Sequence, residues 1–160
     1  MHLVLLPGMM CDARLFAPQT AALSGRVSLH FPTMATRNTV AGLAAEVLAG
    51  APPRFALLGL SMGGIIAMVV VRQAPERVSH LALLDTNPLA EHADVRVRRV
   101  SQMAAVRTGQ LDTVMREEMK PNYLASGEGR TAILDLCLDM ALGLGPDAFI
   151  RQSEALMARP

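Results

Sequence analysis

Residues 59–64, with the sequence Gly-Leu-Ser-Met-Gly-Gly, contain the side chain best suited to covalent chemistry. This Gly-x-Ser-x-Gly spacing lies directly between the apolar stretch 55–58, which predicts a strand, and the apolar stretch 62–73, which predicts a helix. A sharp turn at this point holds the serine in a strained backbone conformation, and the glycines let the strand and the helix approach each other. Ser61 would then project at a helix N-terminus, where the helix dipole favours the negative charge of an oxyanion. We therefore predict that Ser61 is a nucleophile. The alternative, a simple helix N-cap, does not need these glycines.

A second group of candidate residues, Gly8, Met9 and Met10, follows the first apolar stretch of the chain. Gly8 lets the chain turn so that the Met9 backbone N–H points toward Ser61, and the Met62 N–H would be the second donor. Two converging N–H groups form an oxyanion hole, which stabilises the charge that develops on an attacked carbonyl oxygen. We also expect Gly8 and Met10 to line the substrate pocket. The alternatives are an ordinary Pro-Gly turn and a methionine that fills the core.

The elements that position these residues follow from the pattern of apolar stretches. Four of these stretches predict buried strands, over 3–6, 27–31, 55–58 and 78–84, and helices are predicted between them over 13–23, 39–49 (capped by Asn38) and 62–73. Parallel strands joined by helices need cover on both faces. The sequence therefore predicts an α/β fold with three layers: a parallel sheet of about four strands in the order 2-1-3-4, with helices on both faces. Ligands of such sheets bind beyond the C-terminal ends of the strands.

The pattern changes after Asn87. Only helical periodicity remains, and it predicts helices over 91–107, 110–119, 128–142 and 146–158. We therefore divide the chain into a partial α/β core, 1–88, and a helical segment, 89–160.

Composition excludes several classes of protein. A chain of 160 residues with 51% hydrophobic and 18% charged residues can bury a core, which excludes global disorder. The net charge of +1, with no basic stripe, argues against nucleic-acid binding, and no apolar run is long enough to span a membrane. Cys11 and Cys137 are far apart in the sequence and suggest neither a disulfide framework nor a metal site. We interpret them as reduced thiols of a cytoplasmic protein.

The chain resembles the α/β-hydrolase family. Residues 3–9 are similar to the family's oxyanion loop, residues 59–64 to its nucleophile elbow, and the helical segment after Asn87 to its lid. The resemblance implies a Ser–His–acid hydrolase that acts on an ester, a thioester or a related acyl bond of a small molecule, without a metal or a cofactor. The fold alone does not identify the substrate.

The sequence departs from the family at its C-terminus. The family has two further strands there, with a catalytic acid after the first and a catalytic histidine in a loop after the second, so we expect a truncated hydrolase that is inactive by itself. The four histidines, His2, His30, His80 and His92, are each expected to be structural or remote from the site. Asp85 follows the strand beside Ser61, where some family members place the acid; the alternative is an Asp that caps its own turn.

Two further interpretations stay open at this point. The chain could be a non-catalytic scaffold that keeps the fold and forms a homodimer through the uncovered edge of its fourth strand. Arg96, Arg98 and Arg99 predict a solvated helix face, with a grip on a carboxylate or phosphate of the substrate as the alternative. A dinucleotide-binding fold is not favoured, because no Gly-x-Gly-x-x-Gly is present.

Overall fold

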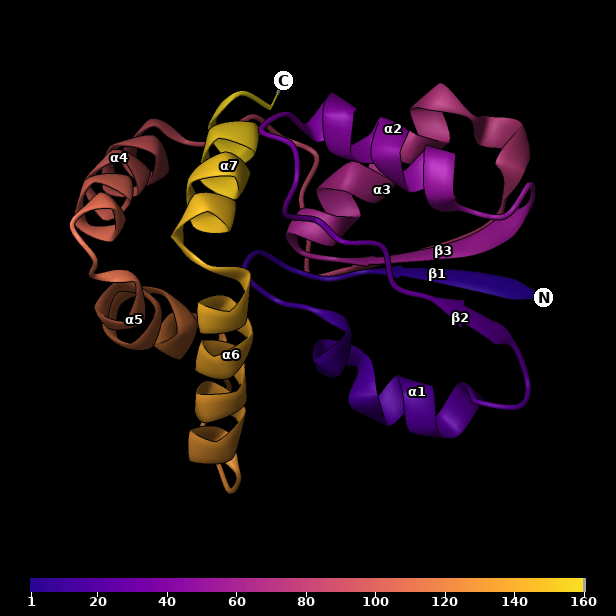
Figure 1. The fold of residues 1–160 in the computed structure, drawn as a ribbon. Helices are drawn as coiled ribbons and strands as arrows, with labels where there is room; N and C mark the ends of the chain where they lie inside the picture. Colours follow the sequence, from indigo (N-terminus) through magenta and orange to yellow (C-terminus); the bar gives the residue numbers. More distant parts are fainter. Residues whose placement is uncertain (160) are drawn as a thin grey trace.

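The computed structural model describes residues 1–159 and contains one parallel sheet, with strands in the order β2-β1-β3-β4 (Figure 1). The strands are β1 (His2–Leu6), β2 (Ser28–His30), β3 (Phe55–Leu60) and β4 (Val78–Leu84). In the register of the sheet, Leu5 pairs with Leu58, and Leu58 pairs with Ala82. The unbroken apolar character of these strands suits parallel pairing inside a core. The predicted α/β class and strand order are confirmed.

Helices connect the strands and lie on both sides of the sheet. They are η1 (Ala13–Phe16), α1 (Ala17–Leu23), α2 (Val40–Gly50), α3 (Met62–Gln73) and η2 (Pro75–Arg77). In Figure 1, α2 and α3 cover one face, and α1 lies on the other side. The N-cap of α2 is Thr39, whose hydroxyl oxygen accepts a hydrogen bond from the Gly42 N–H at 3.1 Å. The prediction that Asn38 caps this helix is wrong; its side chain instead donates to Glu154 in the last helix.

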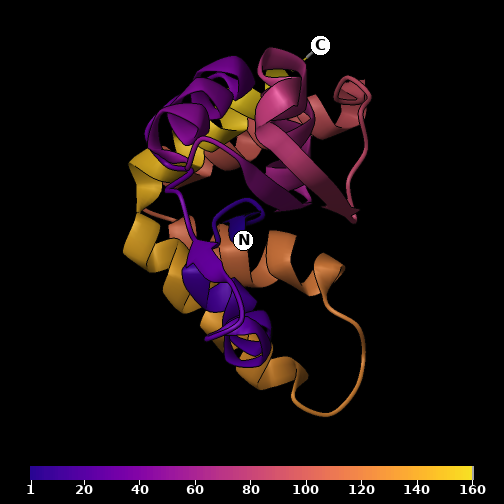
Figure 2. The same ribbon diagram turned by 90° about the vertical axis from the view of Figure 1, so that its right-hand side faces the viewer.

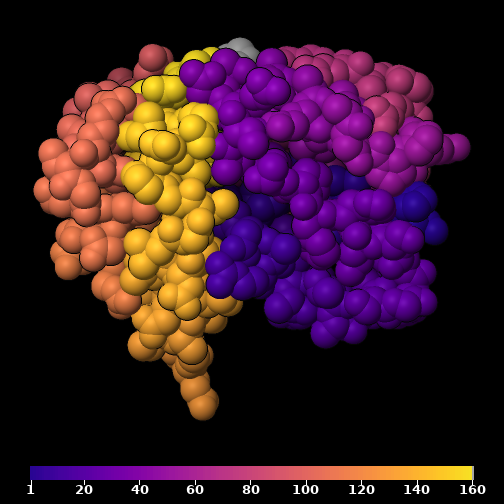
Figure 3. Space-filling model, in the orientation of Figure 1, coloured from indigo at the N-terminus to yellow at the C-terminus, as the bar shows by residue number. Residues whose placement is uncertain are grey.

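Most of residues 93–157 are helical, and these helices lie at the edge of the sheet where the strands end (Figures 1 and 2). They are α4 (Ala93–Arg107), α5 (Leu111–Thr113), the π-helix η3 (Val114–Met119), the 3₁₀-helix η4 (Lys120–Tyr123), α6 (Arg130–Leu144) and α7 (Pro146–Met157). The buried Phe149 and Leu156 of α7 belong to the same core cluster as Val4 and Leu6 of β1. One hydrophobic core therefore joins the helical segment to the sheet, and Figure 3 shows α7 lying against the sheet half.

The outer strand β4 is the least covered part of the sheet. Its apolar side chains Leu81, Leu83 and Leu84 are 43%, 40% and 43% exposed. Within residues 1–159, β4 pairs only with β3, so the backbone groups along its other edge have no strand partner.

None of the helices within residues 1–159 has both the length and the hydropathy that crossing a membrane requires.

Candidate active site

Ser61 occupies a sharp, strained turn between β3 and α3. Its φ of +53° and ψ of −115° are unusual for a residue with a side chain. A Cβ at Gly59 would lie 2.7 Å from the Gly64 Cα, and one at Gly63 would lie 2.7 Å from the Pro7 carbonyl oxygen. Glycine is therefore required where strand, turn and helix meet. Ser61 precedes α3 without making a side-chain capping bond, so the N-cap interpretation is not supported.

Hydrogen bonds to β4 and α3 hold the Ser61 backbone in this conformation. The Ser61 N–H donates to the Leu84 carbonyl at 2.9 Å. The Ser61 carbonyl accepts from the Thr86 hydroxyl at 2.8 Å and from the Gly64 N–H at 2.9 Å. Because the backbone is fixed on both sides, the strained turn persists and the hydroxyl is left exposed.

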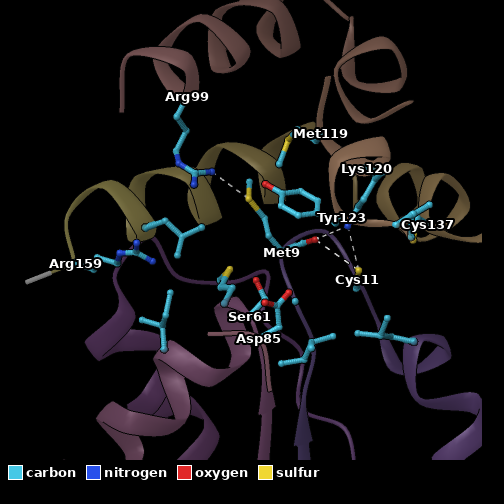
Figure 4. A pocket seen from close by; sticks show the side chains of 17 residues that line it. Met9, Cys11, Ser61, Asp85, Arg99, Met119, Lys120, Tyr123, Cys137 and Arg159 are labelled. Carbon is cyan, nitrogen blue, oxygen red and sulfur yellow. Dashed lines mark hydrogen bonds between the residues drawn. The ribbon is translucent and has the colours of Figure 1, made fainter. Parts of the chain in front are cut away.

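Ser61 faces a cavity of ≈ 280 Å³ between the end of the sheet and the helical segment (Figure 4). Gly8 lies beside Ser61, since a Cβ at Gly8 would be 3.6 Å from the Ser61 Cβ. The part of the chain that carries the sheet lines the cavity with Gly8, Met9, Ser61, Met62 and Asp85, among others. The helical segment lines it with residues that include Arg99, Met119, Lys120, Tyr123, Cys137 and Leu156. The mixture of apolar and charged walls can accommodate a small acyl compound with a polar group.

The structure leaves the two N–H groups that were predicted to form an oxyanion hole without an acceptor in the described chain. Within residues 1–159, neither the Met9 N–H nor the Met62 N–H donates a hydrogen bond. The next N–H after Met9, that of Met10, is occupied, because it donates to the buried Gln152 side chain at 2.8 Å. Met10 is fully buried and is not among the residues that line the cavity. Of the two residues predicted to line the pocket, the structure thus brings Gly8 to the cavity and leaves Met10 in the core.

Asp85 lies next to Ser61 in Figure 4, and both line the cavity. It follows the end of β4 with a φ of +43°, and its side chain makes no hydrogen bond within the described part of the chain. The turn after β4 is capped by Asn87, whose Oδ1 accepts from the Leu89 N–H at 3.0 Å. The alternative role for Asp85, as the cap of its own turn, is therefore not supported.

The four histidines lie away from the cavity, as far as residues 1–159 are concerned. The ring nitrogens of His2 and His30 are 3.0 Å apart on neighbouring strands. The His80 ring is 3.2 Å from the Ser79 hydroxyl, and His92 immediately precedes α4. None of them is placed to take a proton from Ser61.

Arg99 corrects one sequence-based expectation. It is buried rather than solvated, and it forms an ion pair with the buried Glu91 at 2.7 Å. A second guanidinium nitrogen lies 3.2 Å from the Met9 sulfur. Arg96 and Arg98 are exposed, as expected of a solvated face. Since Glu91 neutralises Arg99, this arginine supports the wall of the cavity instead of offering a free charge to a substrate.

Lys120 and the two cysteines form a group that sequence reasoning did not find. The Lys120 ammonium is buried and donates to the Met9 carbonyl at 2.9 Å and to the Cys11 sulfur at 3.3 Å. Cys11 and Cys137 share one small buried cluster with Met140, although they are far apart in the sequence. A hydrogen bond from Cys137 lowers the pKa of the Cys11 thiol to about 6; burial opposes this shift, and the charge of Lys120 adds to it.

Comparison with known proteins agrees with this architecture. A family model described as the alpha/beta hydrolase fold matches residues 27–116. A pimeloyl-[acyl-carrier protein] methyl ester esterase from Klebsiella pneumoniae is 33% identical over an alignment of length 95, which covers 54% of this chain and 37% of that protein. The alignment thus spans well under half the length of the curated relative.

Solved structures resemble the whole chain. A thermophilic esterase from Thermogutta terrifontis superposes with a TM-score of 0.86 at 20% identity, over 100% of this chain and 64% of the other. The enol-lactonase from Burkholderia xenovorans LB400 gives a TM-score of 0.81 at 22% identity, over 99% of this chain and 65% of the other. The family model matches more than half of the residues of this chain, and the strand order and the turn at Ser61 agree with it. This chain therefore belongs to the alpha/beta hydrolase fold family.

Proposed function

We propose that this chain carries the nucleophile and the oxyanion hole of a serine hydrolase that acts on carboxylic esters or thioesters of small molecules. The observation that carries the proposal is the conformation of Ser61: a strained residue with an exposed hydroxyl and no capping bond, at the edge of a cavity. The similarity to an esterase that acts on the methyl ester of pimeloyl-[acyl-carrier protein] supports ester chemistry.

In the proposed mechanism, the Ser61 oxygen attacks the acyl carbon and the carbonyl oxygen becomes negatively charged. The free N–H groups of Met9 and Met62 would donate to that oxygen, and the N-terminus of α3 adds a favourable dipole. The leaving group departs with a proton, and water then releases the acyl group from the serine. Asp85 would serve as the acid that orients a histidine base.

The base is the missing part of this mechanism. No histidine of residues 1–159 lines the cavity, so a histidine from outside this sequence would have to accept the Ser61 proton. Loss of a triad member lowers turnover by several orders of magnitude and leaves only the contribution of the oxyanion hole. We therefore propose that the 160-residue chain by itself hydrolyses simple esters very slowly.

Slow covalent labelling tests the role of Ser61 without needing turnover. The purified chain is incubated for hours with excess fluorophosphonate, and the adduct is located by peptide mapping. A single adduct on Ser61 is expected, because the turn and the free N–H groups favour attack there. Ser61→Ala should remove the adduct, while Ser101→Ala, on an exposed face of α4, should keep it. Labelling of other serines in preference to Ser61 would refute the nucleophile.

Ester turnover tests the missing base. Hydrolysis of p-nitrophenyl butyrate by the chain is expected to be close to the rate of the Ser61→Ala variant. Rapid turnover that Ser61→Ala abolishes would support the nucleophile and contradict the absence of a base.

The exposed edge of β4 favours a second candidate function, a scaffold that pairs with another copy of itself. Leu81, Leu83 and Leu84 offer an apolar strand without a partner in the described chain. Light scattering tests this candidate: a dimer that Leu83→Lys converts to monomer supports it, and a monomer at all concentrations argues against it.

The two free thiols support a cytoplasmic location, which cell fractionation would test.

A further inference from the structure

Two thiols meet in the cavity that holds Ser61, and ester hydrolysis uses neither. Cys11 lies in the loop after β1, two residues beyond Met9, and Cys137 lies in α6. Each is 6% exposed, both belong to one cluster with Met140, and Cys137 and Cys11 both line the cavity. Figure 4 shows them on the same side of the site as Lys120. The cavity thus gives small reagents a route to a pair of adjacent sulfur atoms.

The surroundings of the two sulfurs make them chemically unequal. The Lys120 ammonium lies 3.3 Å from the Cys11 sulfur and stabilises its thiolate. The acidic group that opposes this effect is Asp12, which is engaged by Arg14 at 2.7 Å. The hydrogen bond to Cys11 and, after it, burial raise the pKa of Cys137, so it remains a thiol. An attacking thiolate beside a neutral thiol is the usual arrangement of a reactive cysteine and its resolving partner.

We propose that Cys11 and Cys137 are a modification site for hydroperoxides, and that oxidation joins them in a disulfide. In the first step, the Cys11 thiolate attacks one oxygen of hydrogen peroxide, the O–O bond breaks, and the hydroxide released takes up a proton to become water. Cys11 is then a sulfenic acid. In the second step, the Cys137 sulfur attacks the Cys11 sulfur, an S–S bond forms, and the hydroxyl group leaves as water with the proton of Cys137. Two electrons pass from the thiols to one peroxide.

The disulfide would connect two parts of the chain that now touch without a covalent bond. Cys11 continues the loop that presents the Met9 N–H, and Cys137 is the residue through which α6 reaches the cavity. Lys120 already holds the first of these parts, because its ammonium donates to both the Met9 carbonyl and the Cys11 sulfur of the loop. Oxidation therefore removes the thiolate acceptor of Lys120 and fixes the oxyanion loop to α6.

Mass spectrometry of the reduced 160-residue chain tests this proposal. The chain is treated with equimolar hydrogen peroxide, quenched with N-ethylmaleimide, and analysed intact and after digestion. We expect a loss of two hydrogen atoms, an intramolecular Cys11–Cys137 peptide, and no reaction with the quencher at either position. The Cys137→Ser variant should stop at a sulfenic acid on Cys11 that dimedone traps. In the Cys11→Ser variant, Cys137 should react with peroxide at least about tenfold more slowly than Cys11 does in the wild-type chain, since the Cys137 thiol is protonated.

Two controls separate folding and esterase chemistry from thiol chemistry. In guanidinium, where the wild-type chain is unfolded, the preference for Cys11 should disappear, and this comparison needs no variant. Ser61→Ala should form the disulfide at the wild-type rate, so the proposal can fail or hold independently of the serine nucleophile. Disulfides between chains, equal reactivity of the two folded cysteines, or earlier oxidation of Cys137 would each overturn it.

Discussion

Gln152 holds the loop beside the candidate oxyanion hole, and replacing it tests how that loop is stabilised. This fully buried side chain of α7 accepts a hydrogen bond from the Met10 N–H at 2.8 Å and donates one to the Met34 carbonyl, also at 2.8 Å. Met10 has a φ of +56°, a conformation that a residue with a side chain keeps only when its surroundings impose it. Gln152→Met keeps the length of the side chain and removes both hydrogen bonds.

The expected loss follows from the two backbone groups that the variant leaves unpaired. Each buried, unsatisfied group costs about 1–3 kcal/mol, so Gln152→Met should lower the free energy of unfolding by about 2–6 kcal/mol. With a urea m-value of about 2 kcal/mol per molar, the midpoint falls by about 1–3 M. Circular dichroism during urea titration measures this shift.

The matched control is Gln110→Met, at an exposed glutamine outside the core. It should change the free energy of unfolding by no more than about 0.5 kcal/mol. A loss below about 1 kcal/mol for Gln152→Met would refute the reasoning, because the Met10 and Met34 groups would then find other partners easily.

Three more predictions concern the elbow, the wall of the cavity and the thiols. Gly63→Ala should cost about 3 kcal/mol in urea unfolding, because its Cβ would overlap the carbonyl oxygens at the end of β1, whereas Gly50→Ala, which meets no atom, should be tolerated. Arg99→Met should cost about 3–5 kcal/mol in the same assay, since it leaves a buried carboxylate without its partner; a neutral result would mean that water reaches that carboxylate. The lowered pKa of Cys11 keeps its thiolate present down to about pH 6, so its iodoacetamide alkylation rate should fall as the pH drops through that value. Lys120→Met should move that midpoint upward, and an unchanged midpoint would argue against the role of the ammonium.

The elements that carry the candidate site could be predicted because their signals are local. The helix predicted over 62–73 and the strand predicted over 78–84 have the same bounds in the structure, since continuous apolar stretches end at clear turn residues. The elbow was recognisable because steric crowding allows only glycine at Gly59 and Gly63. Signals of this kind come from residues that are close together in the sequence.

The walls of the cavity could not be predicted in this way, because they depend on pairs that are distant in sequence. Cys11 and Cys137 give no periodic signal, and only the packing of α6 brings them together. Arg99 lies in a run of charged residues that is typical of a solvated surface, yet the segment before α4 places Glu91 beside it, and the two side chains form a buried ion pair. Gln152 likewise belongs to an amphipathic helix, where a polar residue is ordinarily assigned to the exposed face. Such contacts depend on tertiary packing, which overrides local preference.

The hydrogen bond between the Ser61 N–H and the Leu84 carbonyl would couple strand pairing at the outer edge of β4 to the conformation of the turn at Ser61. Leu84 belongs to the strand whose outer edge has no partner in the described chain, and the same residue fixes the turn that holds the serine. A strand that docks along β4 more tightly when this bond is formed would favour the ordered turn. By reciprocity, a ligand that binds more tightly to that ordered turn would raise the affinity of the β4 edge for its partner by the same factor. The effect of edge pairing on ligand affinity and the effect of the ligand on edge pairing would then have the same coupling free energy.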